Sequence, residues 1–545
     1  MQKHVIAFSF LMAFLMPLHL SACTNIIVTK GASANGSAFL AYTNDAEYIY
    51  HLYTQPAADY SQGETISFTN RAGVTGEIPQ PKHTYKLLGF HMNEHQLAIG
   101  ETTFTGRKEL WNQVHFLEYW HLMKLAIERA KTAREAVKIM TRLAETYGYG
   151  SEGESFSIVG KKEAWILEMI GNGKGNTGAI WVARKIPDGM ISAHANKARI
   201  GEFPLDDPEN CLYSDNVIDF AVEKGYYNPD SGEPFRFNEV YCPSTPANLR
   251  YCSARVWSIF RRAAPSLNLS PDYHRGVQEA ERYPLWIKPD EKIQIADMMN
   301  LVRDHYEGTE FDMTKGYSAG PFGNPNKNRP LVWEVDSVQC SWERPISTYN
   351  SAFTFIAQLR PWLPDEIGGL VWFGVDDSYV TCYVPLANSI TRIPEPFRTG
   401  DIRKFSWKSA WWVFNFVGNY ANLRYQDMIV DIQAVQDSIE NAYINEQASV
   451  DKKATALLNK NKSAGIEYMT KLAETRTENL MKRWIQLGQE LITKYNDGYV
   501  KDEQGRPRAV NYPVQYRRNV TKCEPERRLP VWYEDAKKAK EPQAY

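Results

Sequence analysis

The junction between an apolar leader and Cys23 constrains this chain more than any other feature. Residues 5–20, VIAFSFLMAFLMPLHL, form a short apolar run, and two small residues, Ser21 and Ala22, stand directly before Cys23. Such a run, ending at small residues, is typical of a secretory signal peptide rather than of a membrane span. We therefore expect residues 1–22 to be removed, leaving an exported chain that begins at Cys23 and has no transmembrane segment.

A predicted β-hairpin starts at the cysteine itself, with no flexible spacer. Residues 26–28 and 38–42 are apolar, and they flank KGASANGS, a stretch rich in Gly, Ser and Asn. Apolar runs on either side of such a turn predict two paired strands. The same strand–turn–strand pattern recurs in three later segments, at residues 86–104, 155–171 and 178–200.

Two predicted helices lie between these strand pairs. Residues 115–130 have helical apolar spacing, and residues 132–148 begin with Thr132 and Glu135 in capping-box positions and end at Gly148. An order of strands, two helices and strands again favours helices packed on antiparallel sheets, which is an α+β fold.

The C-terminal part has a different pattern. From about residue 406 the apolar spacing is mostly helical, with a helix break expected in the charged stretch 450–463, and the last 40 residues are basic and contain proline. After the leader we expect a main domain, a helical region packed on it and an irregular basic tail, at residues 23–400, 401–500 and 501–545.

Composition and motifs exclude several classes of protein. The formal net charge is −2, with acids and bases interspersed, so nucleic acid is not an expected partner. No HExxH, GxSxG or phosphate-binding loop occurs, and the spacing of the seven cysteines fits no zinc site, so we expect neither a metal nor a cofactor. The six cysteines other than Cys23 can form up to three disulfides in an exported chain, in a pairing that the sequence does not fix.

Three roles compete for Cys23. The tetrapeptide LSAC, residues 20–23, fits a lipobox, although lipoproteins usually place a flexible tether rather than a strand after the cysteine. An exported cysteine is also commonly half of a disulfide. The third role is an N-terminal nucleophile, in which cleavage gives Cys23 a free α-amine. Such an amine titrates near pH ~8 and can accept the thiol proton, so no histidine base is needed.

Acyl transfer also needs hydrogen-bond donors for an oxyanion. Asn93, in MNEHQ, and Asn196, in HANKAR, are candidates, although an asparagine at a turn is more commonly a turn former. Asp45 ends the first predicted hairpin and can hold or orient the α-ammonium group. The alternative is that Asp45 is a solvated residue at a strand end.

Several motifs occur in a fixed order along nearly the whole exported chain: CTNIIVTKGASANGSAFLAYTND, GFHMNEHQLAIGETTF, ISAHANKARI, WIKPDEKIQIADMMNLVRDHYEGT and GGLVWFGVDD. Together they resemble the bacterial dipeptidase family of cysteine N-terminal-nucleophile (Ntn) hydrolases, which is related to the penicillin V acylases and bile salt hydrolases. The resemblance implies an αββα sandwich, with two antiparallel sheets between helical layers and a C-terminal helical extension. It also implies hydrolysis of dipeptides without a metal.

The resemblance further implies roles for single residues. Cys23 matches the nucleophile, Asp45 matches the acid beside the amine, and Asn93 and Asn196 match positions that relatives use around the oxyanion. Many relatives carry an arginine three residues before the acid, where this chain has Tyr42. A phenol donates one hydrogen bond but carries no positive charge. Another source of that charge is an arginine in ERPIST, Arg344.

The leading hypothesis is an exported cysteine-type dipeptidase, periplasmic or extracellular, that forms a thioester on Cys23 with its own α-amine as the general base. An Ntn amidase acting on N-acyl amino acids or conjugated bile acids would use the same site and stays open. So does a lipid-anchored surface protein without enzymatic activity. A homo-oligomer also stays open, and the sequence identifies no substrate-binding residue.

Overall fold

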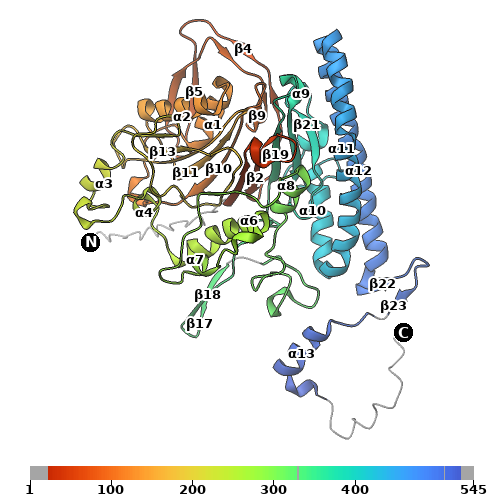
Figure 1. Ribbon diagram of the computed structural model, residues 1–545. Coiled ribbons are helices and arrows are strands. Elements are labelled where there is room, and N and C mark those ends of the chain that lie inside the picture. Colours follow the sequence, from red (N-terminus) through yellow and green to blue (C-terminus); the bar gives the residue numbers. More distant parts are fainter. Residues whose placement is uncertain (1–21, 328–330, 509, 529–545) are drawn as a thin grey trace, which may run out of the picture.

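Two antiparallel β-sheets form the centre of the molecule (Figure 1). The structure is a computed structural model that describes residues 22–327, 331–508 and 510–528, so residues 1–21 of the expected leader and 529–545 of the expected tail lie outside the described residues. In spatial order the seven-stranded sheet contains β16 (Trp286–Ile287), β14 (Ile191–His194), β1 (Ala22–Val28), β2 (Ala38–Asp45), β19 (Phe353–Leu359), β20 (Gly369–Val375) and β21 (Val384–Ala387). The eight-stranded sheet contains β15 (Cys211–Tyr213), β13 (Ile180–Lys185), β12 (Ala164–Ile170), β11 (Gly153–Val159), β10 (Ala98–Phe104), β9 (Met92–Asn93), β8 (Leu87–Leu88) and β3 (Thr54–Gln55).

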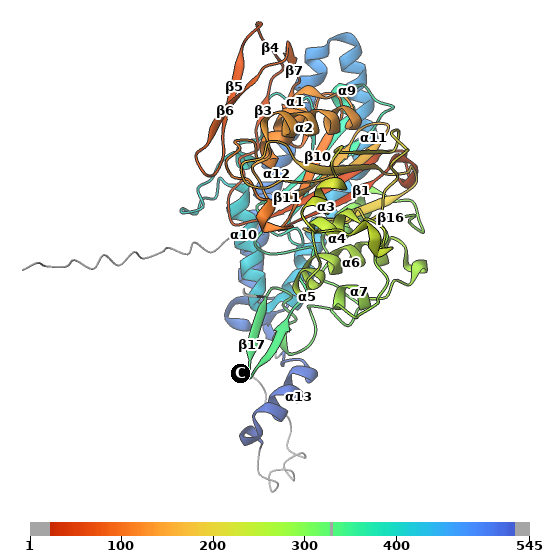
Figure 2. The ribbon, with the colours of Figure 1, turned by 90° about the vertical axis from the view of Figure 1, so that its left-hand side faces the viewer.

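Helices cover the outer faces of the two sheets. The central strands β2, β11, β12, β19 and β20 are buried along their whole length, as expected for strands covered on both faces. The two sheets pack against each other through β1 and β10, while α1 (Tyr119–Arg129) and α2 (Ala133–Tyr147) lie on the eight-stranded sheet. On the other side, α10 (Ala410–Ala421), α11 (Tyr425–Lys460) and α12 (Lys462–Tyr495) lie against the seven-stranded sheet (Figure 2). The predicted α+β class, with antiparallel sheets and helices, is confirmed.

The hairpin predicted at the cysteine is present. Strands β1 and β2 pair in register from Ala22 opposite Asp45 to Val28 opposite Phe39. Strand β1 also pairs with β14, so it is an interior strand with neighbours on both sides. The residue after the expected cleavage point, Cys23, therefore lies in the centre of the fold.

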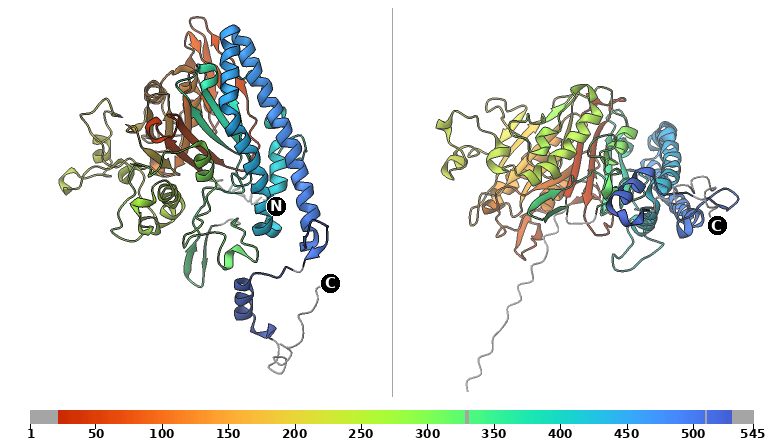
Figure 3. Two further views of the ribbon diagram at one scale, coloured as in Figure 1. Left: turned by 45° about the vertical axis from the view of Figure 1, so that its right-hand side comes forward. Right: turned by 90° about the horizontal axis from the view of Figure 1, so that it is seen from below.

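Local capping signals place the helix ends where the sequence predicts them. The hydroxyl of Thr132 accepts a hydrogen bond from the backbone N–H of Glu135, and α2 ends at Gly148, whose φ of 81° suits a residue without a Cβ. The expected break in the charged stretch falls at Asn461, whose side chain caps the start of α12. Helices α11 and α12 run side by side along one edge of the molecule (Figure 3).

The strand pair predicted over residues 178–200 is wrong in one respect. Both strands form, but β13 pairs with β12 and β15, whereas β14 pairs with β1 and β16 in the other sheet. The turn near Gly189 therefore carries the chain from one sheet to the other. A strand–turn–strand pattern reveals the strands, but each strand takes its partners from distant segments. The crossing brings Asn196, just after β14, beside β1.

Shorter elements surround the sheets. The remaining helices are α3 (Asp219–Glu223), α4 (Phe237–Tyr241), α5 (Pro246–Asn248), α6 (Ala254–Ala263), α7 (Asp272–Arg275), α8 (Ile295–Val302), α9 (Asp365–Gly368) and α13 (Val514–Cys523). Separate two-stranded pairs are β4 (Ala58–Asp59) with β7 (His83–Thr84), β5 (Thr65–Thr69) with β6 (Thr75–Pro79), β17 (Val332–Val335) with β18 (Val338–Ser341), and β22 (Val500–Lys501) with β23 (Pro507–Arg508). Over the described ranges no helix combines the length and hydropathy that a bilayer crossing requires, and all seven cysteines are free thiols.

A buried ion pair joins the helical region to the main domain. Nη1 and Nη2 of Arg303 donate to the carboxylate of Glu440 on α11, at 2.9 and 2.6 Å, and these side chains are 8% and 5% exposed. Because Glu440→Ala would leave the guanidinium buried without this partner, we expect a loss of about 3–5 kcal/mol in the free energy of unfolding. Urea denaturation measures this loss.

The matched control for that experiment is a salt bridge at the surface. Arg392 pairs with Glu467 and Glu474 on α12, and its side chain is 47% exposed. Exposed pairs contribute little to stability, so Arg392→Ala should unfold at nearly the parent's urea midpoint. Equal midpoints for the Glu440 and Arg392 variants would mean that the buried pair does not hold α11 in place.

Candidate active site

The thiol of Cys23 lies in a buried polar cluster. Cys23 is 1% exposed, and its Sγ lies 3.5 Å from Oε1 of Glu101 on β10. The hydroxyl of Tyr42 and Nδ2 of Asn44, both on β2, lie 3.7 and 3.9 Å from the same sulfur. Asn44 stands opposite Cys23 in the strand register, which explains why the amide reaches the thiol.

The backbone of Cys23 is held as well as its side chain. Its nitrogen donates to Oδ1 of Asn196 at 3.0 Å, and its carbonyl oxygen accepts a hydrogen bond from Nη1 of Arg255 at 2.7 Å. Nη2 of Arg255 also donates to Oδ1 of Asn196 at 2.9 Å. Cys23, Asn196 and Arg255 are thus each hydrogen-bonded to the other two. These bonds fix the backbone of Cys23, where the new N-terminus is expected.

Asn196 occupies an unusual backbone conformation. Its φ is 57°, in the left-handed region where asparagine is among the few non-glycine residues that occur regularly. Its Nδ2 donates to the carbonyl of Thr103 at 2.7 Å, which fixes the amide so that Oδ1 faces the nitrogen of Cys23. The structure places Asn196, which the sequence suggests as a donor for an oxyanion, beside the nitrogen of Cys23. Nδ2 carries a second N–H beyond the one given to Thr103, so the amide still has a donor for an oxyanion.

Asp45 is buried and paired rather than solvated. It is 1% exposed, and its carboxylate accepts hydrogen bonds from Nη2 of Arg344 and Oγ of Ser351, each at 3.1 Å. The strand register puts Asp45 opposite Ala22, one residue before Cys23. Arg344 therefore brings its charge to the acid beside the expected N-terminus.

Tyr42, three residues before Asp45, links the cluster by hydrogen bonds. Its hydroxyl donates to Oε1 of Glu101 and accepts from Nδ2 of Asn44 at 2.8 Å. The Nδ2 group of Asn44 can only donate, so the phenol oxygen accepts this hydrogen bond and gives its single proton to Glu101. Tyr42 orders its neighbours without adding a positive charge.

Glu101 and its neighbour Glu154, on β11, were not identified from the sequence. Both are buried, and burial is the largest cause that raises the pKa of each carboxyl. The charge of Glu101 raises the pKa of Glu154 further. Because two like charges buried together are costly, we expect one of the two carboxyls to hold a proton. In the motif GETTF, nothing distinguishes Glu101 from any other polar residue of a strand.

The environment keeps the thiol protonated. Burial is the largest cause that raises the pKa of Cys23, followed by the charges of Glu101 and Asp45. A thiolate is the reactive form of cysteine, and this site does not stabilise one in advance. Nucleophilic attack therefore requires a base that takes the proton as the reaction proceeds.

The structure does not bring Asn93 to this cluster. Its Nδ2 donates to the carbonyl oxygens of Ile127 and Ala130, and its Oδ1 accepts from the backbone N–H groups of His95 and Leu97. Both N–H bonds are thus used in joining a turn to α1. The alternative role, a turn former, describes Asn93 in this structure, and none of these bonds involves Cys23.

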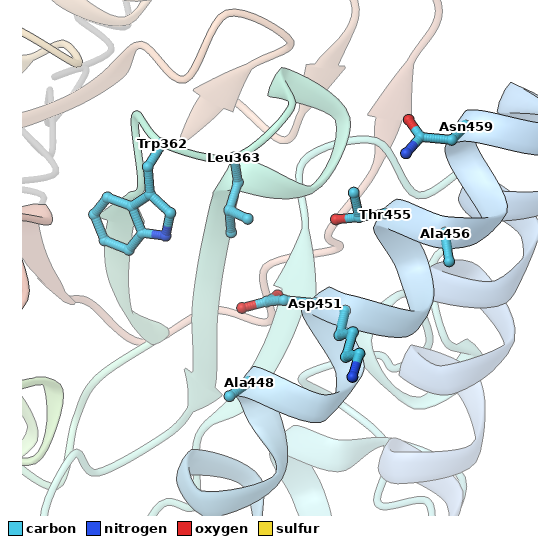
Figure 4. A pocket seen from close by; sticks show the side chains of 8 residues that line it. Trp362, Leu363, Ala448, Asp451, Thr455, Ala456 and Asn459 are labelled. Carbon is cyan, nitrogen blue, oxygen red and sulfur yellow. The ribbon is translucent and has the colours of Figure 1, made fainter.

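The described residues include no metal-ligating cluster, and the cavity beside α11 lies away from the cysteine. Within the described ranges, no group of three or more His, Cys, Asp or Glu side chains is arranged to hold a metal ion. A cavity of about 470 Å³ between α11 and the turn at Trp362 is shown in Figure 4. Its lining residues include Leu363, Asp451 and Thr455 and none from the Cys23 cluster. This cavity is therefore separate from the candidate active site at Cys23.

Comparison with known proteins gives one family and a consistent group of relatives. Residues 22–438 match the model of a family described as peptidase family C69. A "probable dipeptidase" of Latilactobacillus sakei is 26% identical over 416 residues, which cover 73% of this chain and 80% of that protein. A "probable dipeptidase" of Salmonella dublin is 27% identical, with 67% and 80% covered, and "dipeptidase A" of Lactobacillus helveticus is 24% identical, with 74% and 82% covered.

Proposed function

The chain belongs to peptidase family C69, and from this premise we propose that it is an exported cysteine-type dipeptidase whose nucleophile is the N-terminal Cys23. Relatives whose names identify them as dipeptidases support the substrate class. The observation that carries the proposal is the arrangement at Cys23. The thiol and the carbonyl oxygen contact the buried side chains of Glu101 and Arg255, and the nitrogen contacts the half-buried side chain of Asn196. All three contacts are made at the residue that follows the expected leader.

The proposed reaction starts once the leader has been removed. The α-amine of Cys23 accepts the thiol proton while Sγ attacks the carbonyl carbon of the peptide bond. An S–C bond forms, the C–N bond of the peptide breaks, and the proton passes from the ammonium to the leaving amine. Water then attacks the thioester, with the same amine as base, and releases the second product.

Neighbouring residues have positioning roles in this scheme. Asn196 accepts a hydrogen bond from the nitrogen of Cys23, so it can hold the α-amine beside the thiol, and its second N–H is a donor for the oxyanion. Arg255 holds both Asn196 and the carbonyl of Cys23. Asp45, paired with Arg344, supplies negative charge close to the new terminus.

The overall architecture supports an Ntn-hydrolase αββα sandwich. Two antiparallel sheets face each other through β1 and β10, α1 and α2 lie on one outer face, and α10 to α12 lie on the other. We assign residues 23–400 to the catalytic domain, 401–500 to the helical region packed on it, and 501–545 to a basic tail. Residues 1–22 are proposed to direct export and then to be cleaved.

Intact mass together with a substrate panel tests this function. The exported form should have the mass of a chain that begins at an unmodified Cys23, and it should hydrolyse dipeptides faster than N-acyl amino acids or conjugated bile acids. Preference for either of the latter would instead identify an amidase. A diacylglycerol group on the thiol, together with an acylated amine, would remove nucleophile and base and would indicate a lipid-anchored surface protein.

A further inference from the structure

The cluster around Cys23 contains a carboxylate, Glu101, that forms no ion pair with another described side chain. Oε1 of Glu101 accepts hydrogen bonds from the hydroxyl of Tyr42 and the thiol of Cys23, and a carboxyl oxygen that accepts two donors is typical of the ionised form. Glu154 is then the protonated carboxyl, because burial and the charge of Glu101 raise its pKa, and the hydroxyl of Thr103 donates to its Oε2 at 2.8 Å. In the part of the chain that the structure describes, neither carboxyl forms an ion pair.

A second polar group beside the thiol also lacks a partner. Asn44 is 8% exposed, and its Oδ1 has no hydrogen-bond donor among the described residues. The orientation of this amide is fixed because Tyr42 gives its only proton to Glu101 and must therefore accept from Nδ2 of Asn44. A buried acceptor of this kind is costly to leave unpaired, which indicates that a donor from outside the chain fits here.

We infer that Glu101 binds the α-ammonium group of a dipeptide's first residue, with Oδ1 of Asn44 as a second acceptor. This inference rests on the proposed function and adds a reason for the choice of substrate. An ammonium group has three N–H donors and one positive charge, which match a carboxylate and a neutral acceptor. An N-acylated substrate has no such charge and would leave Glu101 buried and uncompensated.

The distances agree with this assignment. A carbonyl carbon poised for attack lies about 3–3.5 Å from the nucleophile. In a dipeptide the α-nitrogen is two bonds from that carbon, so it can lie within hydrogen-bond reach of a carboxylate oxygen 3.5 Å from Sγ. The phenol of Tyr42 also fits this assignment. An arginine at that position would neutralise Glu101, whereas a phenol leaves the negative charge of Glu101 available to pair with the substrate's ammonium group.

Paired substrates and a conservative substitution test the inference. Dipeptides and their des-amino analogues, in which hydrogen replaces the α-ammonium group, should be assayed with the mature parent chain and with Glu101→Gln. We expect Glu101→Gln to lower kcat/KM for the dipeptide about 100-fold, mainly through KM, because loss of one partner of a buried charge pair typically weakens binding by that much or more. Its kcat/KM for the des-amino analogue should stay within about 3-fold of the parent's.

The rate of Cys23 alkylation by iodoacetamide separates binding from proton transfer. The charge of Glu101 raises the pKa of the thiol, so Glu101→Gln should alkylate at least as fast as the parent chain. Slower alkylation, with equal losses on both substrates, would overturn the inference and make Glu101 the base for the thiol. If Glu101→Gln does not fold, Asn44→Ala, which removes the second acceptor, should lower kcat/KM more for the dipeptide than for the des-amino analogue. An equal loss on both substrates would overturn the inference there too.

A buried glutamate outside the cluster serves as the control. Glu168, on β12, accepts hydrogen bonds from the backbone N–H groups of Arg199 and Ile200 and contacts none of the thiol's neighbours. Glu168→Gln should change kcat/KM for dipeptide and des-amino analogue by the same factor. The parent chain tests the proposed function separately: failure to cleave any dipeptide contradicts that function, whereas normal cleavage with an unselective Glu101→Gln contradicts this inference alone.

Discussion

A Cys23→Ala variant of the mature chain should lose dipeptide hydrolysis almost completely, with kcat/KM at least about 10⁴-fold below that of the parent chain. The methyl group cannot form the thioester, and the remaining groups at the site only bind and polarise the substrate. The loss should appear in kcat, because the contacts proposed for the substrate lie on Glu101 and Asn44 rather than on the sulfur. Steady-state assays with a single dipeptide measure the effect.

Two matched variants make this result specific to the nucleophile. Cys23→Ser keeps the α-amine and a weaker nucleophile, so it should retain a small activity above that of Cys23→Ala. Cys252, which donates to the carbonyl of Asn196 at 3.3 Å, is another buried thiol nearby, and Cys252→Ala should keep most of the activity. Undiminished hydrolysis by Cys23→Ala would show that another residue attacks the substrate.

Much of the secondary structure around the site was predictable because it depends on residues that are close together in the sequence. The hairpin that holds Cys23 follows from two apolar runs around a Gly-rich and Asn-rich turn, and the start of α2 follows from the capping pair Thr132 and Glu135. The break expected in the charged stretch 450–463 falls at Asn461, whose side chain caps a new helix better than it continues an old one.

The chemistry around the thiol depends on long-range pairing, and this part was less predictable. Arg255 and Glu101 meet Cys23 from elements 232 and 78 residues away along the chain, and neither has a sequence pattern that distinguishes it from an ordinary buried polar residue. Asn93 is the reverse case, because the sequence suggested it for the site and the structure places its amide against α1. Its motif matches the family, yet its amide is fully used by the backbone of α1 and its own turn.

The electrostatics of the site connect leader removal to activity. Burial, Glu101 and Asp45 all raise the pKa of the Cys23 thiol, so the uncleaved chain holds an unreactive cysteine. Strand β1 includes Ala22 as well as Cys23, and the backbone nitrogen of Cys23 is an amide whose hydrogen points to Asn196. An amide nitrogen has no basic lone pair. Cleavage after Ala22 would therefore create the base at the position where the nitrogen is already held.

A chain that keeps Ala22 should accordingly be nearly inactive, with kcat about 10³-fold below that of the form beginning at Cys23, because it has the thiol but lacks the amine that takes its proton. Both forms can be produced from one fusion protein by placing a specific protease site before Ala22 or before Cys23, which keeps every other residue the same. Removal of Ala22 from the longer form by an aminopeptidase should then restore the activity. Equal activity of the two forms would exclude the α-amine as the base and would leave the carboxylate of Glu101, 3.5 Å from the sulfur, as the group that deprotonates Cys23.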